Sequence, residues 1–376
     1  MKILFAGGGT GGHFYPIIAI AEKINEIIDK EKIVKSKLYF MSDTPYDSVA
    51  LFDHGIEFKK VETGKIRMYF SIQNFFDIIK TFFAVFKALF KVYRIYPDVV
   101  VGKGGYASFP ALMAARILRI PVVIHESDSY PGRVNKWAGK FAERIAVSFD
   151  EAAQYFPSDR TAHTGQPIRS ELLQPSSEGM FEYLKLDPTV PVILILGGSQ
   201  GAEVINNVIL SALPELLSKY QIIHQTGKKH LKNLNVRAEM ILTDSPYKDR
   251  YKTFDFLGIL ATKMAAGASD IIVSRAGSQL FEIAIWGVPS IIIPITHSHG
   301  DHQARNAFNY ARSGAAIAIE ESNLQSHILL QELDKLMKDD KKREEMKQAA
   351  KKFATPDAAE KIAQEIVNIA LRHESR

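Results

Sequence analysis

The sequence predicts an α/β protein with two doubly wound domains, each built on a parallel β-sheet. Strand-like apolar runs alternate with helical patterns along the chain, and several runs are continuously apolar, as expected for parallel strands buried on both faces. The order strand, glycine-rich loop, helix opens the chain at residues 2–12 and recurs 190 residues later, from residue 192. Since each half of the 376 residues begins in the same way, we expect two Rossmann-like domains in tandem.

The expected elements follow from these runs. Strands are predicted at residues 2–6, 37–41, 99–101, 122–125, 144–147, 192–196, 221–224, 271–273 and 290–293. The domain boundary is expected in the stretch 165–175, which is rich in Gly, Pro and Ser. Residues 357–371 form an amphipathic pattern, so we expect a helix there that packs on one of the two domains.

Composition excludes several classes of protein. Apolar residues make up 46% and charged residues 24% of the chain, which is typical of a globular protein and not of a disordered or fibrous one. There is no cysteine, which excludes disulfides, thiolate zinc sites and a cysteine nucleophile. The net charge of +5 is too weak to indicate a nucleic-acid partner. Residues 59–103 contain nine basic and three acidic side chains, so the basic excess is local, and it fits an anionic membrane surface better than nucleic acid.

The start of the chain is predicted to be a first strand. Its apolar run is too short for a signal peptide, so we expect a cytosolic protein. The most apolar stretch, residues 75–92, is interrupted by Asp77, Lys80, Lys87 and Lys91. A membrane-spanning helix needs about 20 mostly apolar residues, so this stretch is not one.

The helical pattern of residues 75–94 allows two interpretations. Its basic side chains lie within about 60° of one another on a helix, and they are Lys80, Lys87, Lys91 and Arg94. Opposite them lie Phe82, Phe86, Leu89 and Tyr93, with Phe83 and Phe90 at the flank. The segment is either a core helix with a solvated lysine face or a membrane-surface element. It has more phenylalanines than one buried stripe requires, which favours partial exposure.

The glycine loops indicate an anionic ligand. Gly7, Gly9 and Gly12 fit G-x-G-x-x-G directly after a strand, where the helix N-terminus supplies positive charge. A dinucleotide site also needs an acidic residue about 20 residues further on, and Asp43 lies too far along. An NAD-dependent oxidoreductase is therefore kept only as an alternative. A third cluster at residues 102–106 lacks the Walker pattern, so an ATPase is not expected.

Six segments together resemble one family. They are Gly8-Gly9-Thr10-Gly11-Gly12-His13 with Pro16; residues 102–110; His125-Glu126-Ser127-Asp128 with Pro131-Gly132 and Asn135-Lys136; Gly165-Gln166-Pro167-Ile168-Arg169; Gly197-Gly198-Ser199-Gln200-Gly201-Ala202; and Ser274-Arg275-Ala276-Gly277 through Glu282, followed by Asp301-His302-Gln303 and Asn306-Ala307. In this order they resemble the MurG family, which transfers N-acetylglucosamine from UDP-GlcNAc to lipid I in peptidoglycan synthesis. The collinearity is more specific than any single motif.

The resemblance implies a GT-B glycosyltransferase fold, in which two Rossmann-like domains face a cleft. It implies an N-terminal acceptor and membrane domain at residues 1–165, with the helix 355–376 packing back on it, and a C-terminal UDP-sugar donor domain at residues 166–354. The implied reaction is inverting and needs neither metal nor cofactor. The implied partners are UDP-GlcNAc, lipid I (undecaprenyl-pyrophosphoryl-MurNAc-pentapeptide) and an anionic membrane, with the enzyme peripheral at the cytoplasmic face of the cell membrane.

The resemblance also implies a donor site. Its residues are Thr10, Gly11, Gly12, Asp128, Arg169, Ser199, Leu257, Ser278, Gln279, Leu280, Phe281, Glu282 and Gln303. Without a metal, the charge of the leaving diphosphate falls to backbone N–H groups, helix N-termini and cations, and the loop 199–202 and Arg169 are the candidates. A carboxylate at Glu282 can accept hydrogen bonds from ribose hydroxyls, although such a residue is also common on a solvated helix face. The family's Gln-Asn is Ser127-Asp128 here, so an amide donor is replaced by a carboxylate.

Two catalytic candidates follow from the first domain. His13 has the intrinsic pKa of a general base near neutrality, or it orients the loop only. Glu126 is a second candidate base, or it is paired structurally with a basic neighbour. The acceptor and membrane residues implied are Gly104, Gly105, Tyr106, Lys80, Phe82, Phe86, Lys87, Phe90 and Lys91.

A metal motif competes with this assignment. His297, His299, Asp301 and His302 spell H-x-H-x-D-H, which resembles the zinc-binding string of metallo-β-lactamase-type hydrolases. The string comes late in a doubly wound pattern, its downstream histidines lie in polar helical surroundings, and Asp301 already fits the donor segment. We therefore expect no metal. A zinc hydrolase and another GT-B enzyme with a lipid acceptor remain the alternatives.

Overall fold

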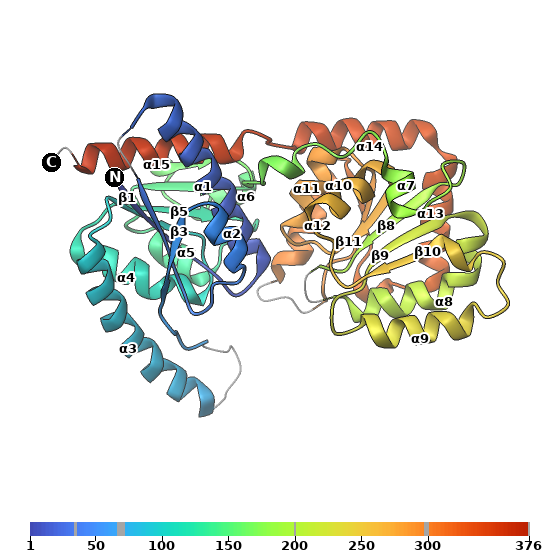
Figure 1. The fold of residues 1–376 in the computed structure, drawn as a ribbon, viewed down its shortest axis with the longest axis horizontal. Helices are drawn as coiled ribbons and strands as arrows, with labels where there is room; N and C mark the ends of the chain where they lie inside the picture. The colour runs from blue at the N-terminus through green and yellow to red at the C-terminus, as the bar shows by residue number, and fades with distance from the viewer. Residues whose placement is uncertain (34–35, 66–71, 199–200, 297–300, 375–376) are drawn as a thin grey trace. The chain divides into compact units, whose positions relative to one another are not determined.

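The computed structural model describes residues 1–33, 36–65, 72–198, 201–296 and 301–374. The chain forms two compact units. The first unit comprises Met1–Arg169 and Thr355–Arg376, and the second unit comprises Ser170–Ala354 (Figure 1).

The first unit is built on a seven-stranded sheet in the order β3-β2-β1-β4-β5-β6-β7. All neighbouring strands are parallel. The strands are β1 (Lys2–Ala6), β2 (Lys37–Ser42), β3 (Ile56–Lys60), β4 (Val99–Gly102), β5 (Val122–Glu126), β6 (Arg144–Val147) and β7 (Thr161–His163). Because the strands are parallel, the loops that follow them gather at one edge of the sheet.

Helices cover both faces of this sheet. They are α1 (Gly11–Glu31), α2 (Ser48–Asp53), α3 (Ile72–Ile95), α4 (Phe109–Leu118), α5 (Arg133–Ala138), α6 (Asp150–Ala153) and α15 (Ala358–Glu374). Alternate residues of β1 point to opposite faces: Ile3 and Phe5 pack with α1 and α15, whereas Leu4 and Ala6 pack with α3 and α4. Apolar runs such as β1 are therefore buried on both sides.

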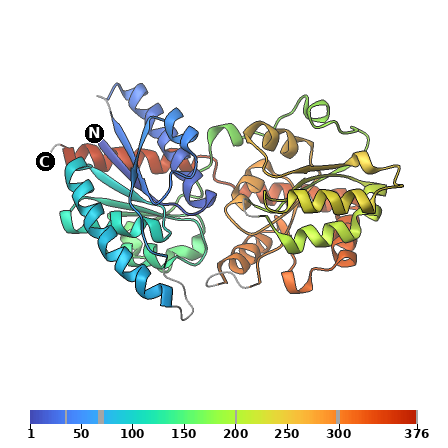
Figure 2. The same ribbon diagram turned by 60° about the horizontal axis from the view of Figure 1, so that its bottom comes forward.

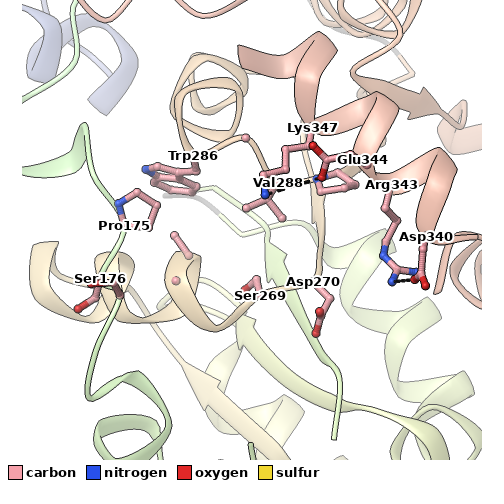
Figure 3. A pocket seen from close by; sticks show the side chains of 15 residues that line it. Pro175, Ser176, Ser269, Asp270, Trp286, Val288, Asp340, Arg343, Glu344 and Lys347 are labelled. Atoms are coloured by element: carbon pink, nitrogen blue, oxygen red, sulfur yellow. Dashed lines mark hydrogen bonds and ion pairs between the residues drawn. The ribbon is translucent and has the colours of Figure 1, made fainter. Parts of the chain in front are cut away.

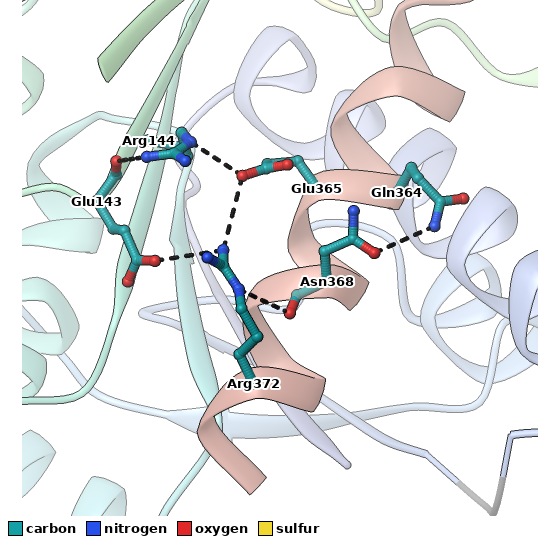
Figure 4. Close-up of polar contacts among 6 residues, drawn as sticks. All are labelled: Glu143, Arg144, Gln364, Glu365, Asn368 and Arg372. Atoms are coloured by element: carbon teal, nitrogen blue, oxygen red, sulfur yellow. Dashed lines mark hydrogen bonds and ion pairs between the residues drawn. The ribbon is translucent and has the colours of Figure 1, made fainter. Parts of the chain in front are cut away.

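The last helix belongs to the first unit (Figure 4). It places Ile362, Ile366 and Val367 in the core beside α1. At its surface Arg144 pairs with Glu365 at 2.9 Å, and Arg372 lies 3.5 Å from Glu143. The apolar contacts carry most of the stabilisation, because exposed ion pairs contribute little.

The second unit repeats the architecture with a six-stranded sheet in the order β10-β9-β8-β11-β12-β13, again parallel throughout. Its strands are β8 (Val192–Leu196), β9 (Gln221–Gln225), β10 (Tyr251–Phe254), β11 (Ile271–Ser274), β12 (Ser290–Ile292) and β13 (Ala316–Ala318). Its helices are α7 (Met180–Leu184), α8 (Glu203–Lys219), α9 (Leu231–Ile241), α10 (Ile259–Ala268), α11 (Gln279–Trp286), α12 (His302–Arg312), α13 (Ser326–Lys338) and α14 (Asp340–Phe353). Helices α8, α9 and α13 share one core with the sheet. Figure 2 shows the elements of each unit after a turn of the view.

The nine expected strands are confirmed, each within one residue of its predicted ends. The sequence prediction missed β3, β7, β10 and β13. All four lie at the edges of the sheets and are only partly buried. Strands β3, β7 and β10 carry no continuous apolar run, whereas the short apolar run of residues 315–319 at β13 was overlooked.

Candidate active site

Each sheet has a switch point, where the strand order reverses, and open α/β sheets bind ligands at that place. In the first unit it lies between β1 and β4, so it is bordered by the loops 7–10 and 103–105. In the second unit it lies between β8 and β11, bordered by the loops 197–202 and 275–278.

The first glycine loop needs glycine for backbone reasons. Gly8 and Gly9 have φ angles of 139° and 91°, a region that other residues rarely adopt. A Cβ on Gly8 would lie 2.2 Å from the Ser42 hydroxyl oxygen. The 21-residue helix α1 begins at Gly11, so its first N–H groups and the positive end of its dipole lie at this edge and favour an anion.

His13 lies in the first turn of α1 and is partly exposed. Thr10 is the N-cap residue, but its hydroxyl makes no cap hydrogen bond and instead lies 2.8 Å from His13 Nδ1. A Cβ on Gly105 would lie 3.8 Å from His13 Nε2, so this edge of the imidazole lies beside the second glycine loop. When Nδ1–H donates to Thr10, Nε2 carries a lone pair and can accept a proton.

The second glycine loop approaches the first one closely. Gly104 and Gly105 have φ angles of 84° and 78°, and a Cβ on Gly105 would lie 3.2 Å from the Gly8 carbonyl oxygen. The Tyr106 hydroxyl donates to Asp43 Oδ2 at 2.6 Å, and burial raises the pKa of Tyr106 to about 12. Asp43 directly follows β2, where dinucleotide-binding folds place the ribose carboxylate, so the expectation that it lies too far along the sequence is wrong. Its carboxylate instead accepts the hydrogen bond from the Tyr106 hydroxyl. This contact counts against a nicotinamide dinucleotide at the first unit.

Glu126 is buried at the end of β5, with 4% of its surface exposed. Its carboxylate accepts hydrogen bonds from the amide N–H groups of Asp128 and Gly132 and from Asn135 Nδ2, each at 3.0 Å. Burial and the neighbouring Asp128 carboxylate raise the pKa of Glu126 above its usual value, although the hydrogen bonds from Asp128 and Asn135 and the charge of Lys103 oppose this rise. This geometry favours a loop-holding role for Glu126 over proton transfer to a ligand.

Besides Thr10, Gly11 and Gly12, two residues assigned by resemblance to the donor site belong to the first unit, Asp128 and Arg169. Asp128 follows β5 and is partly exposed. The Arg169 guanidinium carbon lies 4.0 Å from the ring centroid of Tyr15 on α1, and Tyr15 OH donates to Asp47 at 3.4 Å. Arg169 is therefore held beside the first turns of α1.

The glycine loop of the second unit follows β8. Ser199 lies outside the described residues. Gly201 has a φ angle of 77°, and a Cβ there would lie 2.5 Å from the Thr226 carbonyl oxygen. As in the first unit, the loop leads directly into a long helix, α8, whose N-terminus favours an anion.

Leu257 lies between β10 and α10, and its side chain is buried with 3% exposed. Its N–H donates to Gln225 Oε1 at 3.0 Å, and its carbonyl accepts from Thr262 Oγ1 at 3.1 Å. The backbone is thus fixed by two side chains that the sequence prediction missed. Phe256 beside it is exposed.

The segment 278–282 begins α11 after the switch point. Ser278 is the N-cap residue and Glu282 lies in the first turn, partly exposed. Gln279 is also partly exposed. The side chains of Leu280 and Phe281 are buried in the core, so a donor contact at these two positions would involve their backbone.

A partly buried ion pair holds the backbone just after β12, up to Thr296. Arg275 donates to Glu321 at 2.7 Å, and the other Glu321 oxygen accepts from the Thr296 N–H at 3.0 Å. Burial alone would raise the pKa of Glu321, but the hydrogen bonds from Arg275 and Thr296 outweigh it and lower the pKa. Gln303 on α12 accepts from the Ile295 N–H at 3.2 Å, which places it in the same loop cluster.

The competing metal motif is only partly described. His297 and His299 lie outside the described residues, while Asp301 caps α12 and His302 begins it. Within the described ranges, no group of three or more His, Asp or Glu side chains is arranged to hold a metal ion.

A cavity of about 560 Å³ lies at the edge of the second sheet where β11 and β12 begin, opposite the edge that carries the switch-point loops (Figure 3). It is lined by residues that precede β11 and β12, including Asp270 and Pro289, and by the first turns of α14. Asp270 accepts from the Val192 N–H at 2.8 Å, and Trp286 Nε1 donates to the Leu172 carbonyl at 2.8 Å. Asp270 and Trp286 therefore make hydrogen bonds within the fold. None of the predicted donor residues that the structure describes lines the cavity.

The predicted membrane residues lie on α3, on the outside of the first unit beside α4 (Figure 1). The helix packs on the core through the small residues Ala84, Ala88 and Val92. All seven of its aromatic side chains are exposed, and these are Phe75, Phe76, Phe82, Phe83, Phe86, Phe90 and Tyr93. The expected partial exposure is confirmed, and the interpretation as a core helix with only a lysine face outside is wrong. None of the described helices is long and apolar enough to cross a membrane.

Comparison with known proteins agrees with the motifs. Residues 3–147 match the glycosyltransferase family 28 N-terminal domain, and residues 192–362 match the corresponding C-terminal domain. One similar protein is from Pediococcus pentosaceus, the UDP-N-acetylglucosamine–N-acetylmuramyl-(pentapeptide) pyrophosphoryl-undecaprenol N-acetylglucosamine transferase. The two sequences are 36% identical, and the match covers 96% of this chain and 98% of the Pediococcus protein. Its counterpart from Halalkalibacterium halodurans is 34% identical over 98% of this chain and 100% of its own.

Among solved structures, MurG of Acinetobacter baumannii matches with a TM-score of 0.73 and 26% identity, over 98% of this chain and 99% of that one. The two parallel-sheet units are thus the two domains of a GT-B glycosyltransferase. The predicted resemblance to MurG is confirmed. This chain belongs to glycosyltransferase family 28, in its MurG branch.

Proposed function

We propose that this protein transfers N-acetylglucosamine from UDP-GlcNAc to the MurNAc 4-hydroxyl of lipid I, with inversion at the anomeric carbon, and so makes lipid II and UDP. One observation carries the proposal: relatives with this printed activity match the chain from end to end at 34–36% identity. The glycine loop and helix N-terminus at the switch point of each domain are what a metal-free site for phosphorylated substrates requires.

In the proposed mechanism His13 is the general base. In the tautomer whose Nδ1–H donates to the Thr10 hydroxyl 2.8 Å away, Nε2 accepts the proton of the acceptor hydroxyl. The freed oxygen attacks the anomeric carbon of GlcNAc, the bond from that carbon to the β-phosphate oxygen breaks, and UDP leaves with the electron pair. Helix N-termini and Arg169 stabilise the charge that develops on the diphosphate.

The donor is proposed to bind the second domain. Glu282 accepts hydrogen bonds from the ribose hydroxyls, the Leu257 backbone meets the uracil, and Gln303 contacts the sugar. Ser278, Gln279 and the backbone of residues 280–281 line the same switch point. In the first domain Gly104, Gly105 and Tyr106 are proposed to meet the acceptor.

The test is UDP release from UDP-GlcNAc with and without a lipid I analogue. We expect release that depends on the acceptor, together with a disaccharide product. Release at the same rate without acceptor, or a stronger response to another UDP-sugar, would contradict the proposal and favour the alternative of a different GT-B reaction.

We further propose that α3 attaches the enzyme to the cytoplasmic face of the cell membrane, where a lipid-linked acceptor is found. Exposed phenylalanines such as Phe82, Phe86 and Phe90 are 56–63% accessible, and the basic side chains Lys80, Lys87 and Lys91 lie on the same helix. Apolar rings enter the headgroup boundary while lysines meet anionic lipids. An exposed apolar surface of this kind would otherwise promote aggregation.

Vesicle sedimentation tests this proposal. The triple variant Phe82→Ser, Phe86→Ser, Phe90→Ser should bind anionic vesicles at least about tenfold more weakly, since burying one phenylalanine contributes roughly 1.5–3 kcal/mol, and its thermal stability should not fall. Phe52→Ser is the matched control, because Phe52 on α2 is 84% exposed but lies outside α3. Equal loss in both variants, or no loss in the triple variant, would remove α3 from the membrane contact.

A further inference from the structure

His224 is a histidine inside the second domain. It lies near the end of β9 and is fully buried. Burial lowers the pKa of His224 to about 3, so the imidazole is neutral and takes up no proton near neutrality. A buried polar ring costs free energy unless its nitrogen atoms have hydrogen-bond partners, and no step of the proposed reaction uses this residue.

Both ring nitrogen atoms of His224 have hydrogen-bond partners. Nδ1 lies 2.8 Å from the hydroxyl oxygen of Tyr251 on β10, and Nε2 lies 3.0 Å from Asn206 Oδ1 in the first turn of α8. Asn206 Nδ2 then donates to the Thr226 carbonyl oxygen at 3.0 Å. Asn206 and Thr226 are buried as well. Tyr251, His224, Asn206 and Thr226 thus form one chain of hydrogen bonds, which we call the β9 relay.

The direction of each hydrogen bond in the β9 relay follows from its last member. A backbone carbonyl only accepts, so the Asn206 amide nitrogen faces Thr226 and its Oδ1 faces His224. Because Oδ1 also only accepts, His224 carries its proton on Nε2. Nδ1 then holds a lone pair and accepts from the Tyr251 hydroxyl. One tautomer of a neutral histidine and one orientation of the asparagine therefore satisfy the whole relay.

The β9 relay ends beside the glycine loop of the second domain. Gly201 lies so close to Thr226 that a Cβ there would be 2.5 Å from the Thr226 carbonyl oxygen. The start of the loop lies on the same strand end, because the Gly197 N–H donates to the Gln225 carbonyl oxygen at 3.2 Å. Asn206 belongs to the helix into which this loop leads. The relay therefore joins the end of β9, the glycine loop and the N-terminus of α8.

These three pieces must keep a fixed geometry if they receive a phosphate group. A helix N-terminus binds phosphate through N–H groups that point at its oxygen atoms, so the rotation of α8 and the place of the loop both matter. The apolar contacts of α8 with the sheet are not directional, whereas hydrogen bonds weaken steeply with a poor angle or distance. The β9 relay supplies the directional contacts that the apolar core lacks.

We propose that Tyr251, His224 and Asn206 are positioning residues, which hold the glycine loop and the first turn of α8 in the geometry that receives the diphosphate of the donor. This inference rests on the proposed function, which makes a UDP-sugar the donor. The proposed base contact depends on another side chain, because Gln225 holds Leu257 and points to the opposite face of β9. A defect in the relay should therefore weaken the binding of UDP and spare that of uridine.

Calorimetry of UDP and uridine binding to the full-length enzyme tests the proposal. His224→Asn removes the donor at the Nε2 position, and UDP should bind about 10–100-fold more weakly, the range for a lost hydrogen bond to a charged group. His224→Gln restores the donor, because its amide nitrogen reaches the place of Nε2, and UDP affinity should return to within about threefold of the wild type. Uridine affinity should change by less than about threefold in both variants, since its contacts lie outside the relay.

Tyr251→Phe provides a milder test that stands if His224→Asn does not fold. The phenyl ring keeps the packing and only the hydroxyl donor is lost, so UDP should bind about 2–10-fold more weakly, as expected for a neutral hydrogen bond. Tyr183→Phe is the matched control, because Tyr183 on α7 is an exposed tyrosine of the same domain, and it should change neither affinity. In the wild type, ¹⁵N NMR should show His224 neutral, with its proton on Nε2.

Equal losses of UDP and uridine affinity in His224→Asn, or a glutamine variant as weak as the asparagine variant, would show a packing role only and overturn the inference. A proton on Nδ1 of His224 would also overturn it, because the relay would then have no consistent direction. Neither measurement uses the acceptor. An enzyme that binds UDP through an intact relay but transfers nothing to lipid I would thus refute the proposed function and leave the positioning role supported.

Discussion

The two domains share one topology but differ in the chemistry at their switch points. In the first domain, titratable groups gather there: His13 beside Gly105, and behind the loops the buried Lys103 and Glu126. In the second domain the loop after β11 carries Arg275, whose charge is paired with Glu321, and the neutral side chain of Gln225 holds the loop after β10. This difference underlies the proposal that the first domain supplies the general base and the second domain binds the donor.

His13→Ala tests whether the first domain supplies the general base. We expect this variant to have the largest effect. Loss of a general base should lower kcat by about 10²–10⁴-fold, with little change in KM for UDP-GlcNAc. His327→Ala is the control, because His327 is an exposed histidine of the second domain. A fall in donor affinity at unchanged kcat would move His13 from catalysis to donor binding.

Glu282→Ala tests whether the second domain binds the ribose of the donor. A lost charged hydrogen bond should cost roughly 1.5–3 kcal/mol, seen as a KM for UDP-GlcNAc that rises about 10–100-fold with kcat little changed. The exposed carboxylate of Glu239 on α9 provides the control variant Glu239→Ala. An unaltered KM in Glu282→Ala would remove the ribose contact.

Two variants of the glycine loop in the second domain test how tightly its backbone is packed. Gly201→Ala combines a strained positive φ with a Cβ 2.5 Å from a carbonyl oxygen, whereas Gly198→Ala has the strain but nothing within 4 Å. Gly201→Ala should therefore lower the free energy of unfolding by roughly 1–3 kcal/mol more than Gly198→Ala does, which is the usual cost of overpacking. Equal unfolding free energies in the two variants would show that the loop can shift.

The smallest expected effect concerns the Arg275–Glu321 pair and its pH dependence. The pKa of Glu321 is lowered in the folded protein, so its contribution to stability is present above the unfolded pKa of the group and is lost as pH falls through the folded one. Glu321→Gln should cost about 1 kcal/mol near neutrality, and the difference from wild type should shrink in acid. A difference that stays constant in acid denaturation would exclude the ionised pair.

Much of the fold follows from the sequence, because central strands are buried on both faces and are continuously apolar. Edge strands such as β10 lack that signal, and only pairing with β9 defines β10. The glycine loops and His13 were predicted because backbone conformation and chemistry restrict the residue types there.

Other parts of the site depend on contacts between distant segments. Tyr106 reaches Asp43 across 63 positions of sequence, and Arg275 reaches Glu321 across 46. Likewise Lys103 meets Ser127 only because β4 and β5 are neighbours. No local pattern announces such pairs, so the sequence prediction missed them.

The return of α15 to the first domain has a consequence for the order of synthesis. Residues 1–169 leave the ribosome first, but their core lacks the side chains of α15 until the end of the chain has been made. The second domain is continuous and can fold in between. The domain that begins first is thus completed last, and a nascent chain arrested before α15 should expose the apolar face of α1.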